Sequence, residues 1–267
     1  MLTLSHLANL MALLFGDRPE TMQLVARNLR QARLVSTGGR GRGGARQQPL
    51  HVAHMIIAAC AANQVADVAG TVSTFANLEL SDSTAPRKRG RAGGDGEHAV
   101  PRELQFATRR NVTLGAVVAG LVDMAANGGL YSLLMNHAAE FVDRDLLRAG
   151  ADAIKHAPRG KKPEATAELA AKMVAHVQTL IDQSAVYLNL SFLRPLPGAL
   201  VEFGTQHEGE TTRLLRVQFG LPAAFLANPR NAPKLSAWRR MDRSHQVTIS
   251  HRTLLSIGQA IAAEEGA

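Results

Sequence analysis

The side chains with the most direct chemical potential lie within residues 17–46. A polar helical face in this segment contains two glutamines and two arginines, namely Gln23, Arg27, Arg30 and Gln31. Amide and guanidinium groups can make paired hydrogen bonds to the edges of adenine and guanine in the major groove. The loop that follows adds three further arginines, Arg40, Arg42 and Arg46. Five glycines leave this loop free to approach phosphates or to enter a minor groove, so the segment predicts a DNA-binding surface.

The charge balance agrees with a polyanionic partner. Residues 1–50 carry seven arginines against Asp17 and Glu20, a net charge of +5. The whole chain carries +8, with a sequence pI near 10.3. A balance of this size suits nucleic acid or an anionic membrane without choosing between them. Because no apolar run approaches the roughly 20 residues that span a bilayer, we expect no membrane association.

Composition indicates a helical protein of a reducing compartment. Aromatic residues are only 4% of the chain although hydrophobic residues are 46%, which favours helices over sheets of stacked aromatics. Cys60 is the single cysteine, so no internal disulfide can form, as is typical of the cytoplasm. No Lys or Arg precedes the first hydrophobic run and no small-residue cleavage site follows it. We therefore expect a helix there rather than a signal peptide.

Other chemistries find little support in the sequence. His51 and His54 could share a helical face and form a metal site with Cys60, but no fourth ligand has suitable spacing. No serine lies in a G-x-S-x-G context and the carboxylates form no convincing pair. We therefore expect no catalytic residue, no metal and no enzymatic activity.

A second motif overlaps the Gly-Arg loop. Residues 39–44 match G-x-G-x-x-G, and Asp67 lies 23 residues beyond the last glycine. A dinucleotide site needs a hydrophobic strand before this motif, whereas here the preceding residues have helical periodicity. No lysine of the P-loop type follows it either. The sequence therefore predicts no nucleotide cofactor.

Helical periodicity organises the N-terminal part of the chain. Four helices are expected, over residues 3–15, 19–33, 49–62 and 65–78. The second should begin with Asp17 and Glu20 as an N-terminal capping pattern and with Pro19 in its first turn. Its buried stripe is predicted to consist of Met22, Val25, Ala26 and Leu29. Residues 36–48 are predicted to form a loop.

Residues 81–103 have almost no apolar content and form the best candidate boundary. Within them P-R-K-R-G-R-A resembles the core of an AT-hook, although Ala92 stands where a proline is usual. Its cations are possible accessory DNA contacts: Arg87, Lys88, Arg89 and Arg91. A solvated linker explains the same composition.

Beyond the boundary, helices are expected over residues 112–127, 129–149, 164–188 and 250–264. Alternation at Val201 and Phe203, and again at Leu215 and Val217, predicts a β-hairpin near 199–219. A short strand is expected over 246–249. Residues 230–252 form a second cationic run, with a net charge of +5 around Trp238. This run suits either a phosphate-contacting surface or a basic rim around an anchoring Trp in a dimer interface.

The order of these N-terminal patterns resembles bacterial winged helix-turn-helix regulators, of the kind carried by α-proteobacterial prophages and related mobile elements. The second helix ends in L-R-Q-A-R-L-V and leads into S-T-G-G-R-G-R-G-G. In these families L-R-x-x-G-L-(I/V) closes the recognition helix before the wing, and Arg33 stands where glycine is usual. The resemblance covers about the first 50 residues. It implies recognition-helix contacts for the Gln and Arg face, wing contacts for the loop arginines, and a homodimer or higher homo-oligomer.

The sequence thus predicts a mainly α fold. Residues 1–80 would form a winged-helix DNA-binding domain, 81–103 a basic flexible linker, and 104–267 a helical partner or oligomerisation domain with the small hairpin. We expect sequence-specific binding of double-stranded DNA and transcription regulation, in the bacterial cytoplasm and associated with the nucleoid. Two alternatives stay open, a phage DNA-packaging protein of small-terminase type and a protein-interaction module with a basic surface.

Overall fold

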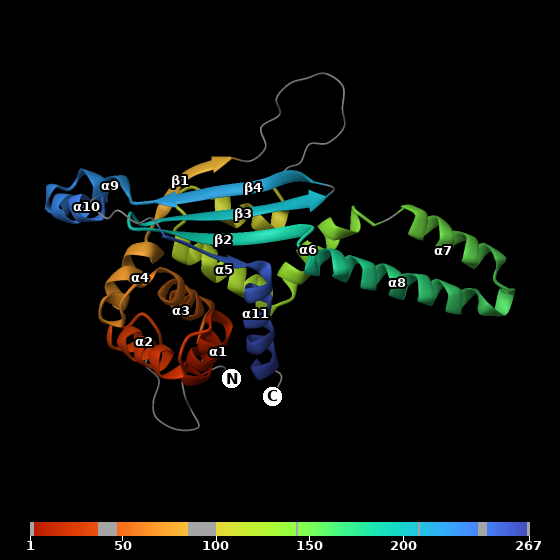
Figure 1. Ribbon diagram of the computed structural model, residues 1–267, viewed down its shortest axis with the longest axis horizontal. Helices are drawn as coiled ribbons and strands as arrows, with labels where there is room; N and C mark the ends of the chain where they lie inside the picture. Colours follow the sequence, from red (N-terminus) through yellow and green to blue (C-terminus); the bar gives the residue numbers. More distant parts are fainter. Residues whose placement is uncertain are drawn as a thin grey trace, which may run out of the picture.

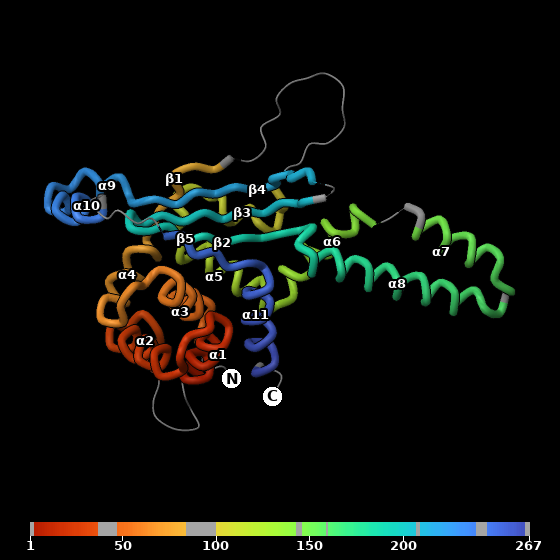
Figure 2. The backbone as a smooth tube through the Cα atoms, viewed as in Figure 1, coloured from red at the N-terminus to blue at the C-terminus, as the bar shows by residue number. Residues whose placement is uncertain are grey.

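The computed structural model describes residues 3–36, 47–84, 100–142, 144–207, 209–239 and 245–265. The fold is mainly helical, as predicted, and contains one five-stranded antiparallel sheet (Figure 1). The N-terminal helices, red to orange in Figure 1, form a group beside the sheet. A pair of helices in green extends sideways from the body, as the tube in Figure 2 also shows.

The N-terminal group follows the predicted order of helices. Its elements are α1 (Leu4–Phe15), α2 (Pro19–Gln31), α3 (Pro49–Ala61), the 3₁₀ turn η1 (Val65–Asp67) and α4 (Val68–Ala76). The Thr3 side chain caps α1 by accepting from the His6 amide, and Gly16 ends α1 in the left-handed conformation with φ 70°. The predicted cap of α2 is wrong. Because Pro19 occupies the first helical position, Arg18 is the N-cap residue, and its side chain makes no capping bond.

At the end of α2, Arg33 stands at the glycine position of the L-R-x-x-G-L pattern. Arg33 has φ 59°, the left-handed conformation that glycine adopts most readily. This backbone lets the Leu34 amide donate to the Leu29 carbonyl oxygen at 2.9 Å, which closes the helix. The position therefore keeps the conformation expected of a glycine although an arginine occupies it.

The remaining elements follow in chain order. They are β1 (Glu79–Thr84), η2 (Arg102–Thr108), α5 (Leu114–Ala126), α6 (Gly129–Ala139), α7 (Arg144–His156), η3 (Arg159–Lys161), α8 (Lys162–Asp182), β2 (Val186–Arg194), β3 (Gly198–His207), β4 (Glu210–Gly220), α9 (Ala223–Ala227), η4 (Pro229–Asn231), α10 (Ala232–Arg239), β5 (His245–Ser250) and α11 (His251–Glu265). The strand and final helix predicted near the C-terminus are confirmed. Two predicted helices, 129–149 and 164–188, are wrong in extent.

Both errors have local causes. The first predicted helix is interrupted after Ala139, and α7 begins only at Arg144. The second ends at Asp182, because Ser184 adopts a left-handed φ of 61° and Val186 begins a strand. Buried and half-buried residues alternate along the first part of β2, the two-residue period of a strand.

The sheet has the order β1-β4-β3-β2-β5. The predicted hairpin is confirmed as β3–β4, with Val201 opposite Val217 and Phe203 opposite Leu215. It forms the middle of a larger sheet, however, instead of standing alone. The predicted linker begins within β1, since Ser81–Thr84 belong to this edge strand beside β4. Residues 85–99 lie outside the described residues.

One continuous core joins the N-terminal helices to the sheet. Helix α5 lies at its centre, with α3, α4 and α11 packed against it. Glycines permit two close approaches: Gly115 of α5 lies against Ala76 of α4, and Gly258 of α11 lies against Ala125 of α5. Phe75 of α4 also meets Phe192 of β2, with ring centroids 6.1 Å apart.

Apolar helices occur in this core but not at spanning length. Among the described residues no single helix is both long and apolar enough to cross a bilayer. In the described ranges one pair, α5 and α6 taken together, passes on length and composition, and these two helices meet at a bend of 80°.

Candidate nucleic-acid interface

Helix α2 has one buried and one exposed side. The predicted stripe is confirmed, since Met22, Val25, Ala26 and Leu29 are all buried. Residues 3.6 positions apart share a face, so the opposite side presents Glu20, Leu24, Arg27 and Gln31. Arg30 lies at the border of this exposed side.

Three of the four predicted reading residues, Arg27, Arg30 and Gln31, are exposed. Within the described part of the chain, none of their side chains makes a hydrogen bond or ion pair. No described residue occupies their donors, so an external partner can contact them. We name Arg27, Arg30 and Gln31 the α2 polar face.

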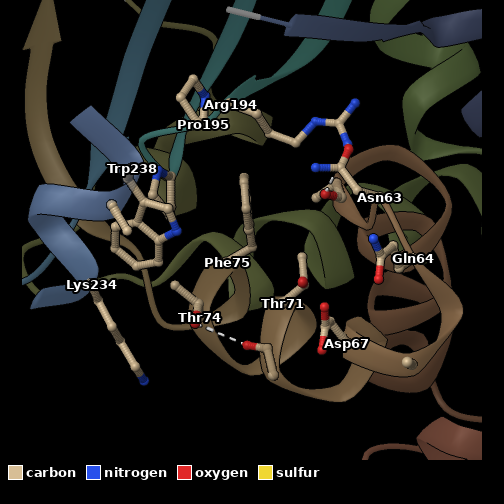
Figure 3. Close-up of a pocket in the computed structure, with 15 residues that line it drawn as sticks. Asn63, Gln64, Asp67, Thr71, Thr74, Phe75, Arg194, Pro195, Lys234 and Trp238 are labelled. Atoms are coloured by element: carbon tan, nitrogen blue, oxygen red, sulfur yellow. Dashed lines mark hydrogen bonds between the residues drawn. The ribbon is translucent and has the colours of Figure 1, made fainter. Parts of the chain in front are cut away.

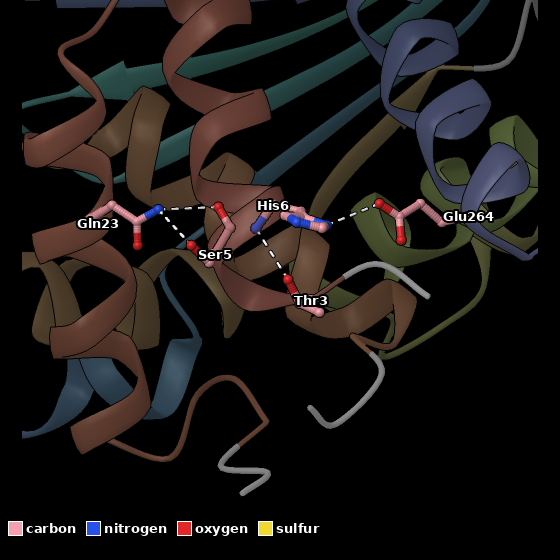
Figure 4. A network of polar contacts seen from close by, with 5 residues as sticks. All are labelled: Thr3, Ser5, His6, Gln23 and Glu264. Carbon is pink, nitrogen blue, oxygen red and sulfur yellow. Dashed lines mark hydrogen bonds and ion pairs between the residues drawn. The ribbon is translucent and has the colours of Figure 1, made fainter. Parts of the chain in front are cut away.

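The side chain of Gln23, the fourth predicted residue, makes hydrogen bonds to α1 (Figure 4). Its Nε2 donates to the Ser5 carbonyl oxygen at 3.1 Å, to Ser5 Oγ at 3.0 Å and to Asn9 Oδ1 at 2.9 Å. These bonds tie α2 to α1. The structure thus separates Gln23, which positions the helix, from the α2 polar face.

Further contacts hold α2 in place. Asn28 Nδ2 donates to the Val65 carbonyl oxygen of η1 at 2.9 Å. Just beyond the helix, a ring nitrogen of His54 lies 2.6 Å from the Leu34 carbonyl oxygen. The sequence pattern predicted neither contact. His54 interrupts an otherwise apolar run in α3, and such an isolated polar residue was the available signal.

The neighbourhood of the α2 polar face is shallow and mixed in character. A hollow of about 420 Å³ is lined by Pro19, Glu20, Gln23, Leu24 and Arg27. Leu24 is 46% exposed at this surface. A shallow, open hollow with no cluster of acids or nucleophiles among its described lining residues suits surface recognition better than chemistry on a small substrate.

The predicted wing arginines, Arg40, Arg42 and Arg46, lie outside the described residues, as do the accessory cations Arg87, Lys88, Arg89 and Arg91. The ends of the Gly-Arg loop are described. Val35 and Gln47 are both buried, so both ends are anchored in the protein. Residues 32–36 and 47–48, which flank the loop, form no strand.

The alternative metal site does not assemble. Within the described ranges no three His, Cys, Asp or Glu side chains are grouped as metal ligands. His51 Nδ1 accepts from the Gln48 amide at 3.2 Å in a capping box, and burial together with nearby His54 lowers the pKa of His51. Burial raises the pKa of the Cys60 thiol, so the neutral form is favoured.

The second cationic run is only partly described. Arg230 and Lys234 are exposed, whereas Arg252 Nη2 lies 3.5 Å from Ser184 Oγ. Trp238 is half-buried and stacks on Phe225, with ring centroids 6.2 Å apart.

Comparison with protein-family models, with curated proteins and with solved structures gave no match. A functional interpretation therefore rests on the geometry and the charge of α2. On that basis α2 is the best candidate interface, because it combines a rigid attachment with open hydrogen-bond donors.

Proposed function

We propose that the protein binds double-stranded DNA sequence-specifically and acts as a transcription regulator, with α2 as its reading helix. In this proposal α1, α2 and the Gly-Arg loop form a winged helix-turn-helix unit. The observation that carries the proposal is the α2 polar face, whose donors have no partner among the described residues. The opposite side of the same helix is buried, so the face is held on a rigid support.

The dimensions of α2 fit the proposal. Its 13 residues extend about 20 Å, at about 1.5 Å per residue. A helix of this kind enters the major groove, which is about 12 Å wide. Arg27 and Arg30 can then pair with guanine edges and Gln31 with adenine. Arg40, Arg42 and Arg46 would contact the backbone or the minor groove nearby.

The proposal extends to assembly through the resemblance to dimeric regulators. Two copies would place two reading helices on half-sites about one helical turn apart. Selection of bound duplexes from a random DNA pool, with the full chain, tests both parts together. A symmetric enriched motif supports a dimeric reader, whereas no enriched motif contradicts sequence-specific binding.

Arg27→Ala tests the reading helix directly. If Arg27 reads a base, the variant should lose about 1–3 kcal/mol of discrimination between the selected duplex and a random duplex. Discrimination is the difference between the two binding free energies, measured by fluorescence anisotropy at one salt concentration. Equal weakening on both duplexes would move Arg27 to a phosphate contact.

Two glutamines of α2 provide a matched control. Gln31→Ala removes an exposed amide and should reduce discrimination without changing the unfolding free energy. Gln23→Ala removes three bonds to α1, so it should lower the unfolding free energy by about 1–2 kcal/mol. If Gln31→Ala leaves discrimination unchanged, the assignment of Gln31 as a reading residue is wrong.

The loop arginines are tested by salt dependence. Replacing Arg40 and Arg42 together should reduce the slope of log binding constant against log salt by about one unit for each lost phosphate contact. An unchanged slope would contradict a DNA-bound loop. It would leave the assignment of the α2 polar face intact, because that assignment is measured by discrimination.

A further inference from the structure

A cavity of about 540 Å³ opens between α4, the end of β2 and α10 (Figure 3). Its volume is within the range of about 300–1,000 Å³ that small-molecule sites occupy. The side chains that matter for recognition come from all three elements: Thr71 and Thr74, Arg194, and Lys234 and Trp238. No residue of α2 lines it. The cavity is therefore separate from the proposed DNA interface.

An aromatic ring forms one wall of this cavity. Trp238 stacks on Phe225 with their ring planes 18° apart, which fixes the orientation of the indole. Phe225 does not line the cavity, whereas Trp238 does. The part of the indole surface that Phe225 does not cover therefore faces the cavity. A planar ring is the group that such a surface receives best.

Two cations lie around the same space. Lys234 is exposed and pairs with no carboxylate among the described residues. Arg194 Nη1 donates to the Ala61 carbonyl oxygen at 3.3 Å and to Asn63 Oδ1, which orients the guanidinium. Its Nε is buried without a hydrogen-bond partner in the described structure. Among the described lining residues Asp67 is the one acid, against Arg194 and Lys234, so this part of the lining carries a net positive charge.

Hydroxyl groups complete the polar side. Thr74 Oγ1 donates to the Gly70 carbonyl oxygen at 2.9 Å, the bond drawn as a dashed line in Figure 3. The hydroxyl oxygen of Thr74 can still accept a hydrogen bond. Thr71 is half-buried on the same helix and one turn before Thr74. Both can bond to the ribose or phosphate of a ligand.

We propose that this cavity binds a nucleotide, with the base against Trp238 and the phosphate beside Lys234. Aromatic side chains stack on bases of every kind, and lysine and arginine are the usual partners of phosphate oxygens. A ligand with a planar group joined to an anion can contact both the indole and the cations. This assignment gives a role to part of the second cationic run and does not depend on DNA binding by α2.

The single tryptophan makes the proposal directly measurable. Thymidine monophosphate added to the full chain should quench Trp238 fluorescence with saturation. Thymidine without phosphate should need at least about tenfold higher concentration, because it lacks the charge-assisted bonds. Absence of saturable quenching by thymidine monophosphate would overturn the proposal.

Two variants locate the site. Lys234→Gln should raise the half-saturating concentration of thymidine monophosphate about tenfold, the effect of one lost charge-assisted bond. Arg230→Gln is the matched control, because Arg230 is an exposed cation on the neighbouring η4 that does not line the cavity. Equal responses of the two variants would overturn the assignment. Unchanged circular dichroism spectra ensure that folding does not explain a difference.

Two sources share this chemistry: a free nucleotide and an unpaired nucleotide within a single strand. Parallel titrations with thymidine monophosphate and with a short oligothymidylate separate them. Tighter binding of the monophosphate identifies a free nucleotide, whereas tighter binding of the oligothymidylate identifies a strand, and both results support the site.

Discussion

The contact between α11 and α5 predicts the effect of one added methyl group. At Gly258 a Cβ atom would lie 2.3 Å from the carbonyl carbon of Ala125, 2.5 Å from its oxygen and 2.7 Å from its Cβ. Carbon atoms pack about 3.5–4.0 Å apart, so the two helices would have to separate by about 1 Å. Such overpacking costs about 1–3 kcal/mol, and the backbone atoms at Ala125 cannot rotate away. Replacing glycine within a helix returns about 1 kcal/mol. Because the shortest contacts are to backbone atoms at 2.3 and 2.5 Å, the upper end of the packing cost applies, and we expect Gly258→Ala to lower the unfolding free energy by about 2 kcal/mol.

Urea unfolding followed by circular dichroism measures this change, provided that the slopes against urea concentration stay equal. Gly70→Ala is the matched control, because Gly70 is also helical but has no atom within 4 Å of an added Cβ. It should raise the unfolding free energy by about 0.5–1 kcal/mol. Adding Ala125→Gly to Gly258→Ala should not restore stability, since the two shortest contacts are to backbone atoms. Unfolding free energy equal to or above that of the original chain in Gly258→Ala would refute the packing argument.

Three more predictions concern single side chains. Arg33→Gly should raise the unfolding free energy by about 0.5–1 kcal/mol in the same urea assay, because Arg33 is held at φ 59°; a decrease would contradict strain at this position. Burial, aided by Arg252 and opposed by the Ile181 backbone and Asp182, lowers the pKa of His251 from its ordinary 6.5. Below pH 6.5 His251 therefore binds a proton more readily in the unfolded chain than in the folded chain. The unfolding free energy should consequently fall as the pH drops below this value. His251→Leu should make the unfolding free energy depend less steeply on pH, as measured by urea titrations across pH 5–7, while the part due to His51 remains. An unchanged pH dependence would exclude His251 as a source. Cys60, whose pKa burial raises, should resist alkylation by iodoacetamide at pH 8 until urea unfolds the chain, and rapid alkylation of the folded protein would contradict its buried position.

Helical periodicity was sufficient to find most of the N-terminal half. The spacing of Met22, Val25 and Leu29 identified the buried side of α2, and therefore also its exposed side. Pro49 correctly marked the start of α3. Period-two alternation at Val201 and Phe203 identified β3 in the same way. These signals are local, because each depends only on which residues one helix or strand must bury.

The predictions that were wrong concern residues whose structure depends on contacts with distant parts of the chain. Residues 81–84 are polar and resemble a linker, yet they form a strand because the backbone of β4 is available to pair with them. In the same way, the polar character of Gln23 suggested an exposed reading residue, whereas Ser5 and Asn9 of α1 take up its amide. The cavity beside Trp238 could not be predicted either, since its lining comes from three segments far apart in the sequence.

The pairing of β1 also bears on how the chain is made. Ser81 Oγ donates to the Gln218 carbonyl oxygen at 3.0 Å, across 137 residues of sequence. At about 5–20 residues per second, synthesis delivers the second partner roughly 7–27 s after the first. Until then β1 lacks the strand beside it, and for most of this interval Phe75 also lacks its neighbour Phe192. The N-terminal half is thus the first to leave the ribosome but cannot finish folding until the sheet arrives, which makes the newly made chain most vulnerable to proteases and aggregation during that interval.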